Sequence, residues 1–167
     1  MPPITRLNPI VALALLSLTC LATARAAAFE FEGFALGMPH AQASTLRPDV
    51  AWQPDASGAA GSMARKEFTA SYLGREAQVS IGLDPEGKFV RLIAFAFRPE
   101  SGSQCILDAV GARLQLEKRI GPAMESSNEA FGRRMKWIDA DGATVRWLEA
   151  CAVDAGGYFV TYAKPAD

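Results

Sequence analysis

The sequence is poor in the residues from which metal and nucleophilic sites are built. It contains one histidine, His40, and three cysteines among 167 residues. A structural zinc site takes four ligands, mostly Cys and His, and catalysis of the Ser-His-Asp or Cys-His type needs a histidine base. Both would therefore depend on His40. No glycine-rich loop of the kind that cradles phosphates is present. The sequence predicts no metal, no cofactor and no catalytic residue.

Excess positive charge is also lacking. The chain has 17 Lys and Arg against 18 Asp and Glu, a formal net charge of −1. Such a balance does not provide the attraction to phosphates on which DNA and RNA binding depends, so we expect no nucleic-acid partner. Half of the residues are hydrophobic and 21% are charged. This composition is typical of one globular domain and excludes a disordered chain.

A sustained apolar run occurs at the N-terminus, where residues 10–22 are apolar or small. The run follows Arg6 and precedes two small-x-small patterns that end at Ala26 and Ala28. This is the layout of a cleavable secretory signal, and the run is shorter than the roughly 20 residues that span a membrane. We expect a leader over 1–28 that is cleaved after Ala26 or Ala28. The mature protein would be periplasmic or secreted, with no membrane span.

The three cysteines fit an exported protein. Cys20 lies inside the leader, and its alternative role as a lipid-anchored N-terminus is disfavoured because Leu18 is one place out of position and Thr19 is large. Cys105 and Cys151 remain after cleavage, and an even count in an oxidising compartment favours one disulfide. The alternative is a pair of buried free thiols. Their spacing excludes a CxxC redox pair.

The mature chain alternates between strand patterns and two helix patterns. A short helix is expected from Pro39 to Leu46, and a longer one over 103–120 after a cap at Ser101 or Ser103. The longer helix carries an apolar stripe, the side by which a helix normally packs; the stripe consists of Ile106, Val110 and Leu114, widened by Leu107 and Ala109. Strands are expected over 64–72, 76–83, 88–98, 131–138, 143–151 and 158–163, with a further short one over 29–34.

A local repeat supports a two-unit organisation. The pattern D-x-x-G-x-F-V over 84–90 recurs over 154–160, seventy residues later. Each copy opens the third strand of a helix-strand-strand-strand unit. We therefore expect a single α+β domain over 29–167 built from two such units, about 29–99 and 100–167. Their strands would form an antiparallel sheet with the helices on one face.

The turn Asp139-Ala140-Asp141-Gly142 superficially matches the start of a calcium loop. Its twelfth position, where an acidic ligand belongs, is Ala150, and its glycine comes at the fourth position instead of the sixth. A hairpin turn is the better interpretation.

The segment Gly37-Met38-Pro39-His40-Ala41-Gln42-Ala43 resembles the helix start of small exported bacterial domains, and Ile120-Gly121-Pro122 resembles their helix-ending turn. These families are the SmpA/OmlA-type outer-membrane assembly lipoproteins and the β-lactamase-inhibitor-like domains. The resemblance implies helices packed on an antiparallel sheet and a role in binding proteins. Pro39 departs from the usual Ser or Thr cap.

Two features are candidate binding sites. Arg133 and Arg134 lie close to Trp137 in sequence, and Trp147 is on the next expected strand; Arg and Trp are enriched at interface hot spots. The alternative is a core Trp137 with solvated charges around it. Trp52, in a long loop, is either a partner anchor or a lid packed on the sheet.

The sequence supports a non-enzymatic protein-binding or inhibitor-type module, with another exported or envelope protein as the expected partner. Two alternatives stay open. One is a small hydrolase that uses carboxylates and His40. The other is a carrier that holds an apolar ligand beneath the helices.

Overall fold

A computed structural model describes residues 29–54, 64–129, 132–151 and 156–164, so the expected leader and Cys20 lie outside the described residues. The strands are β1 (Glu30–Phe31), β2 (Phe34–Ala35), β3 (Arg65–Tyr72), β4 (Arg75–Leu83), β5 (Val90–Phe97), β6 (Glu125–Glu129), β7 (Gly132–Ile138), β8 (Thr144–Glu149) and β9 (Tyr158–Ala163). The helices are α1 (His40–Ala43) and α2 (Gly102–Ile120).

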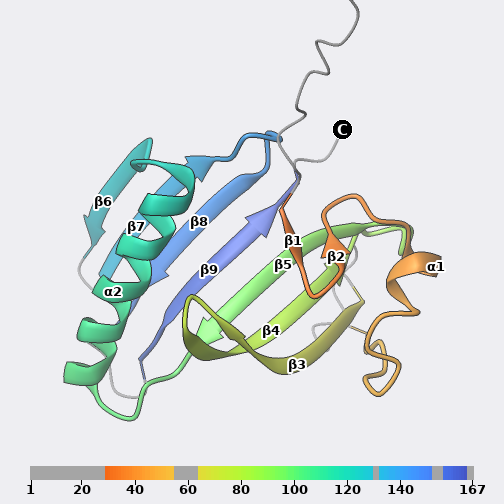
Figure 1. Ribbon diagram of the computed structural model, residues 1–167, viewed down its shortest axis with the longest axis horizontal. Coiled ribbons are helices and arrows are strands. Elements are labelled where there is room, and N and C mark those ends of the chain that lie inside the picture. The colour runs from red at the N-terminus through yellow and green to blue at the C-terminus, as the bar shows by residue number, and fades with distance from the viewer. Residues whose placement is uncertain (1–28, 55–63, 130–131, 152–155, 165–167) are drawn as a thin grey trace, which may run out of the picture.

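Seven strands form one antiparallel sheet in the order β3-β4-β5-β9-β8-β7-β6 (Figure 1). The consecutive strands β3, β4 and β5 make one half, and β6 to β9 make the other. The halves join where β5 pairs with β9, with Phe95 opposite Val160. The strand β5 is therefore central in the sheet, with Phe95 and Phe97 buried on one face and Ala94 and Ala96 partly exposed on the other. Asp154 of the sequence repeat lies outside the described residues, and the repeat stays a prediction.

The predicted fold class is wrong. We expected an α+β domain with two helices on one face, whereas the described chain is mostly β: a seven-stranded sheet, a two-stranded ribbon of β1 and β2, and two helices. The helix expected from Pro39 to Leu46 has only four residues, and no side chain caps it. In addition, β6 was not expected. Its sequence, ESSNE, lacks apolar alternation because it lies at the sheet edge.

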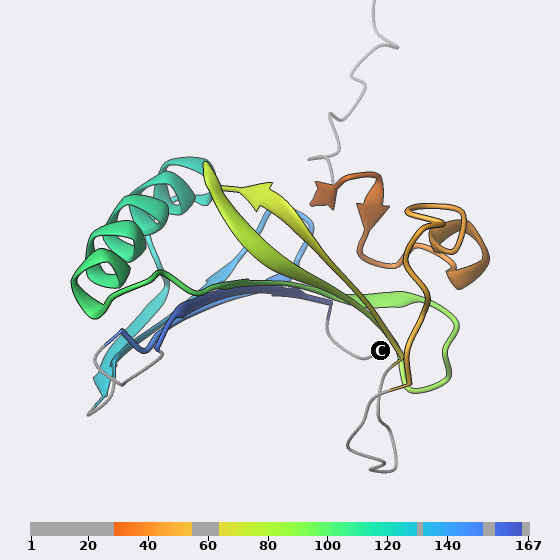
Figure 2. The same cartoon turned by 90° about the horizontal axis from the view of Figure 1, so that it is seen from below.

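The two faces of the sheet differ in what covers them. The helix α2 and the β1–β2 ribbon lie on the same side of the curved sheet (Figure 2). The core lies between these elements and the sheet; its largest side chains are Trp137, Trp147, Tyr158, Tyr162, Phe34, Phe95 and Phe97. Of the described helices and strands, none lies against the opposite, open face (Figure 2).

The expected disulfide is confirmed. Cys105 in α2 is bonded to Cys151, which follows β8; their Cα atoms are 5.5 Å apart, and their sequence separation is 46. Ser101 caps the helix, because its hydroxyl accepts a hydrogen bond from the backbone N–H of Gln104 at 3.2 Å. Cap and disulfide together fix the start of α2 against the sheet. No helix within the described ranges is long and apolar enough to cross a membrane.

Candidate protein-binding surface on helix α2

Helix α2 packs on the sheet through its smaller side chains. Its buried residues are Cys105, Asp108, Ala109, Ala112 and Leu116. Two alanines on this side let the helix lie close to the large core residues of β7 and β8. The indole N–H of Trp137 donates a hydrogen bond to the carbonyl of Gly121, at the end of the helix, over 3.0 Å. Side chains of the core thus occupy the space beneath α2, where an apolar-ligand carrier would need a cavity.

Four large aliphatic side chains lie on the outside of α2 instead. Ile106, Leu107, Val110 and Leu114 are between 40% and 68% exposed; we call these four residues the outer stripe. Apolar patches of this kind on a folded protein mark interaction surfaces. The apolar stripe expected from the sequence is therefore present on α2, but its large side chains point away from the sheet. Only Ala109 of the expected stripe is buried.

The rotation of α2 about its axis is fixed by polar and covalent contacts. The Asp108 carboxylate, nearly buried, accepts from Arg75 of β4 at 2.8 Å and from the Gln104 amide at 2.8 Å. Cys105, one turn before Ala109, is bonded to Cys151. At 100° per residue, the outer stripe lies about 150° around the helix from Cys105. Contacts at Cys105 and Asp108 therefore hold the stripe toward solvent.

A glycine lies beside the outer stripe in the middle of α2. A Cβ added at Gly111 would meet nothing within 4 Å, so packing within the described residues does not require a glycine there. Glycine in a helix interior costs about 1 kcal/mol relative to alanine. Its absent side chain would let another backbone approach the helix closely at this point.

The end of α2 adds positive charge to this surface. Lys118 and Arg119 lie in the last turn, and the first turn has no acidic residue. Both cations are exposed. At 100° per residue, Lys118 lies next to Leu107 on the side of the outer stripe. The Arg119 guanidinium instead lies over the rings of Phe29 and Tyr72, 5.9 Å from each centroid. The candidate surface thus combines an apolar stripe with one cation, Lys118.

The structure brings only some of the predicted basic and aromatic residues together. Trp137 and Trp147 are each 1% exposed and belong to the core. The Arg133 guanidinium donates to the Asn128 side chain at 3.1 Å. Arg134 lies on the open face, where it lines a hollow of about 710 Å³ together with Trp147, Lys136, Arg146, Leu148 and Phe159.

Trp52 and His40 pack against each other at the other end of the molecule. Their rings meet edge to face with centroids 5.1 Å apart, and Trp52 is half-buried. Within the described ranges, no hydrogen bond or ion pair joins His40 to a carboxylate. Trp52 thus packs against the core, and its role as a lid or as a partner anchor stays a prediction.

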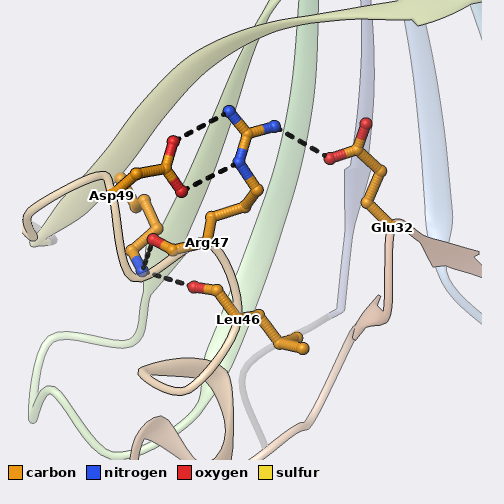
Figure 3. A network of polar contacts seen from close by, with 5 residues as sticks. Glu32, Leu46, Arg47 and Asp49 are labelled. Atoms are coloured by element: carbon orange, nitrogen blue, oxygen red, sulfur yellow. Dashed lines mark hydrogen bonds and ion pairs between the residues drawn. The ribbon is translucent and has the colours of Figure 1, made fainter.

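A buried lysine anchors the loop that carries Trp52 (Figure 3). Lys66 is 1% exposed, and its ammonium donates to the carbonyls of Leu46 and Arg47 at 2.6 and 3.0 Å. Burial lowers its pKa. The guanidinium of Arg47 pairs with Glu32 and Asp49, each at 3.2 Å. These contacts stabilise the loop, because the charged groups of Lys66, Arg47, Glu32 and Asp49 all have partners within the network.

Sequence reasoning found the outer stripe but assigned it to packing. A second pattern on the same helix shows that the outer stripe faces away from the sheet. Its residues share one face of the helix and are Cys105, Ala109, Ala112 and Leu116. Because the expected disulfide requires Cys105 to point toward the sheet, this second face is the inner one.

Comparison of the chain with family models, with curated proteins and with solved structures finds no match.

Proposed function

We propose that the protein is an exported, non-enzymatic binding module of the inhibitor type, and that it inserts the outer stripe of α2 into an apolar cleft of a partner protein. The observation that carries the proposal is the exposure of Ile106, Leu107, Val110 and Leu114 on one side of a helix. A helix that lays an apolar face into a groove is a recurring mode of protein recognition. Export is supported by the sequence of the leader and by the disulfide.

The size of the stripe favours a cleft as the complementary surface. Helix α2 has 19 residues, a length of about 28 Å. A flat contact along one side of such a helix buries less than the roughly 1,200 Å² typical of specific interfaces. A cleft that wraps the helix buries more of it, and Gly111 permits the close approach that this requires. The same area argument disfavours a second copy of this chain paired through α2 alone.

The charge at the end of α2 indicates which charge the partner's cleft should carry at its edge. Lys118 follows the stripe on the same side of α2, so a partner with an acidic side chain at that end complements this cation. The resemblance of residues 37–43 to exported domains that bind proteins supports the same class of function.

The test is site-specific photocrosslinking in the envelope fraction of the source cell. A photoreactive residue replaces Leu107 in one variant and Leu148, an exposed leucine on the open face, in the matched control. We expect one protein to be crosslinked from position 107 and not from 148. Excess unlabelled wild-type protein should compete, whereas the L107D/L114D double variant should not.

Two results would contradict the proposal. Equal crosslinking from both positions would show that the stripe has no special role. Crosslinking from position 107 to a second copy of this chain would make α2 a dimer surface instead of a surface for a different protein.

A further inference from the structure

The open face of the sheet contains a hollow that belongs neither to the core nor to the outer stripe. It has a volume of about 710 Å³ and extends across β6, β7, β8 and β9. Proteins bind small molecules in clefts of roughly 300–1,000 Å³. Of the described helices and strands, none covers this face (Figure 2). The hollow is therefore accessible and has the size of a small-molecule site.

Side chains from neighbouring strands line the hollow in two rows. The first row, which we call the cationic row, consists of residues at directly opposed positions of β7, β8 and β9: Lys136, Arg146 and Thr161. In the second row, Leu148 of β8 lies opposite Phe159 of β9; we call these two residues the apolar pair. The rows are two residues apart along each strand, a distance of about 7 Å. A small molecule in the hollow can therefore contact both positive charge and apolar surface.

The cationic row has a positive charge that the sheet does not balance. Lys136 and Arg146 are directly opposite each other, and like charges at such positions destabilise a sheet. The Lys136 ammonium pairs with the Glu125 carboxylate at 2.8 Å. Arg146 is exposed, and none of the described residues forms a hydrogen bond or an ion pair with its guanidinium. An anion bound at Arg146 would balance this charge and reduce the repulsion from Lys136.

The apolar pair is accessible from the same side. Leu148 is 37% exposed and Phe159 is half-buried. The neighbours of Phe159 along β9, Tyr158 and Val160, point into the core, so the Phe159 ring points toward the open face. Solvent-facing positions of an antiparallel sheet are normally polar. Leu148 and Phe159 together therefore offer an apolar floor on which a ring-sized group can lie.

We propose that this hollow binds a small organic anion, whose carboxylate or sulfonate group pairs with Arg146 and whose ring-sized apolar body lies on the apolar pair. A guanidinium can donate two parallel hydrogen bonds to such a group. The Thr161 hydroxyl, on the strand opposite Arg146, can donate a third. The site goes beyond the proposed binding of a protein by α2. It lies on the other face of the sheet, so the two proposals fail separately.

The first experiment is a fluorescence titration with two probes that share their aromatic rings and differ in charge. Anilinonaphthalene sulfonate is an anion, and N-phenylnaphthylamine is its neutral counterpart. We expect the wild-type protein to bind the sulfonate about tenfold more tightly, as a charge-assisted hydrogen bond from Arg146 implies. Equal affinity for the two probes would overturn the proposal, because the positive charge would then have no role.

Variants of the two rows assign the affinity to their parts. Arg146→Gln should weaken binding of the sulfonate about tenfold and leave the neutral probe unchanged. Phe159→Ala should weaken binding of both probes. Arg98→Gln, which removes an exposed arginine outside the hollow, and L107D/L114D, which alters the outer stripe, are the controls and should bind both probes as the wild type does.

The controls also define the results that contradict the site. An equal loss of sulfonate affinity in Arg98→Gln and Arg146→Gln would show that only net charge matters. A loss of affinity in L107D/L114D would place the probe on α2 instead of the open face. Either result would overturn the proposal.

A companion measurement locates the probe without any substitution. We expect the amide NMR shifts caused by anilinonaphthalene sulfonate to be concentrated in β7, β8 and β9, whereas shifts concentrated in α2 would overturn the proposal. Inorganic sulfate should cause these shifts only at much higher concentration, because it lacks the apolar body; equal potency would overturn the role of the apolar pair. Co-sedimentation with anionic lipid vesicles that is lost in Arg146→Gln would also overturn the proposal, since the open face would then bind a membrane surface.

Discussion

Three buried tyrosines govern how the protein responds to alkali. The hydroxyl groups of Tyr72 and Tyr162 are 2.7 Å apart in the core. Burial raises the pKa of both, and burial together with Asp108 raises the pKa of Tyr158 to about 12. The folded protein therefore keeps these protons at a pH at which the unfolded chain, with tyrosine pKa near 10, releases them.

The sign of the effect follows from proton counting. Above about pH 10 the unfolded state binds fewer protons than the folded state, so the free energy of unfolding falls as pH rises. We expect a steep loss of stability between pH 10.5 and 12, measured by urea unfolding at each pH. Lys66, with its lowered pKa, acts in the opposite direction, but only below pH 10.5.

Tyr162→Phe should make the fall of the unfolding free energy with pH shallower, because the variant lacks one of the hydroxyl protons that the folded state retains. Phe95→Leu, in the same aromatic cluster, is the control: it should lower stability at every pH and leave the slope unchanged. An unaltered slope in Tyr162→Phe would contradict the role assigned to this hydroxyl.

At the scale of the element, the orientation of α2 can be tested by its leucines. Leu116 is fully buried and Leu107 is 68% exposed. Leu116→Ala should cost about 3 kcal/mol of stability, because it leaves a cavity in the core. Leu107→Ala should change stability by less than about 0.5 kcal/mol. Denaturant midpoints of the two variants decide the matter; equal losses would mean that the stripe is packed.

The same helix shows how far its sequence pattern can be interpreted. Periodicity correctly located α2 and its apolar stripe. It could not identify the inner side, because Cys105, Ala109 and Ala112 form a second, small-residue face whose burial depends on what lies beneath it. With Trp137 and Trp147 in the sheet, only the small face fits closely.

At the scale of the whole molecule, the disulfide joins distant parts of the chain. It links the start of α2 to the segment after β8. In the chain-entropy model a closed loop of this length stabilises the folded state by about 4 kcal/mol. We expect Cys105→Ser/Cys151→Ser to lose roughly 2–4 kcal/mol in urea unfolding, and reductant to have the same effect on the wild type but none on the double variant.

The sequence by itself determined the positions of most strands, the approximate limits of α2 with a cap at Ser101 or Ser103, and the pairing of Cys105 with Cys151. These features follow from local periodicity, from turn and cap residues, and from cysteine count. Only the tertiary structure decided that the protein is mostly β, that β5 joins β9 in one continuous sheet, and that the outer stripe faces solvent. A local pattern specifies which residues share a face, but burial depends on which other elements, remote in sequence, arrive to cover it.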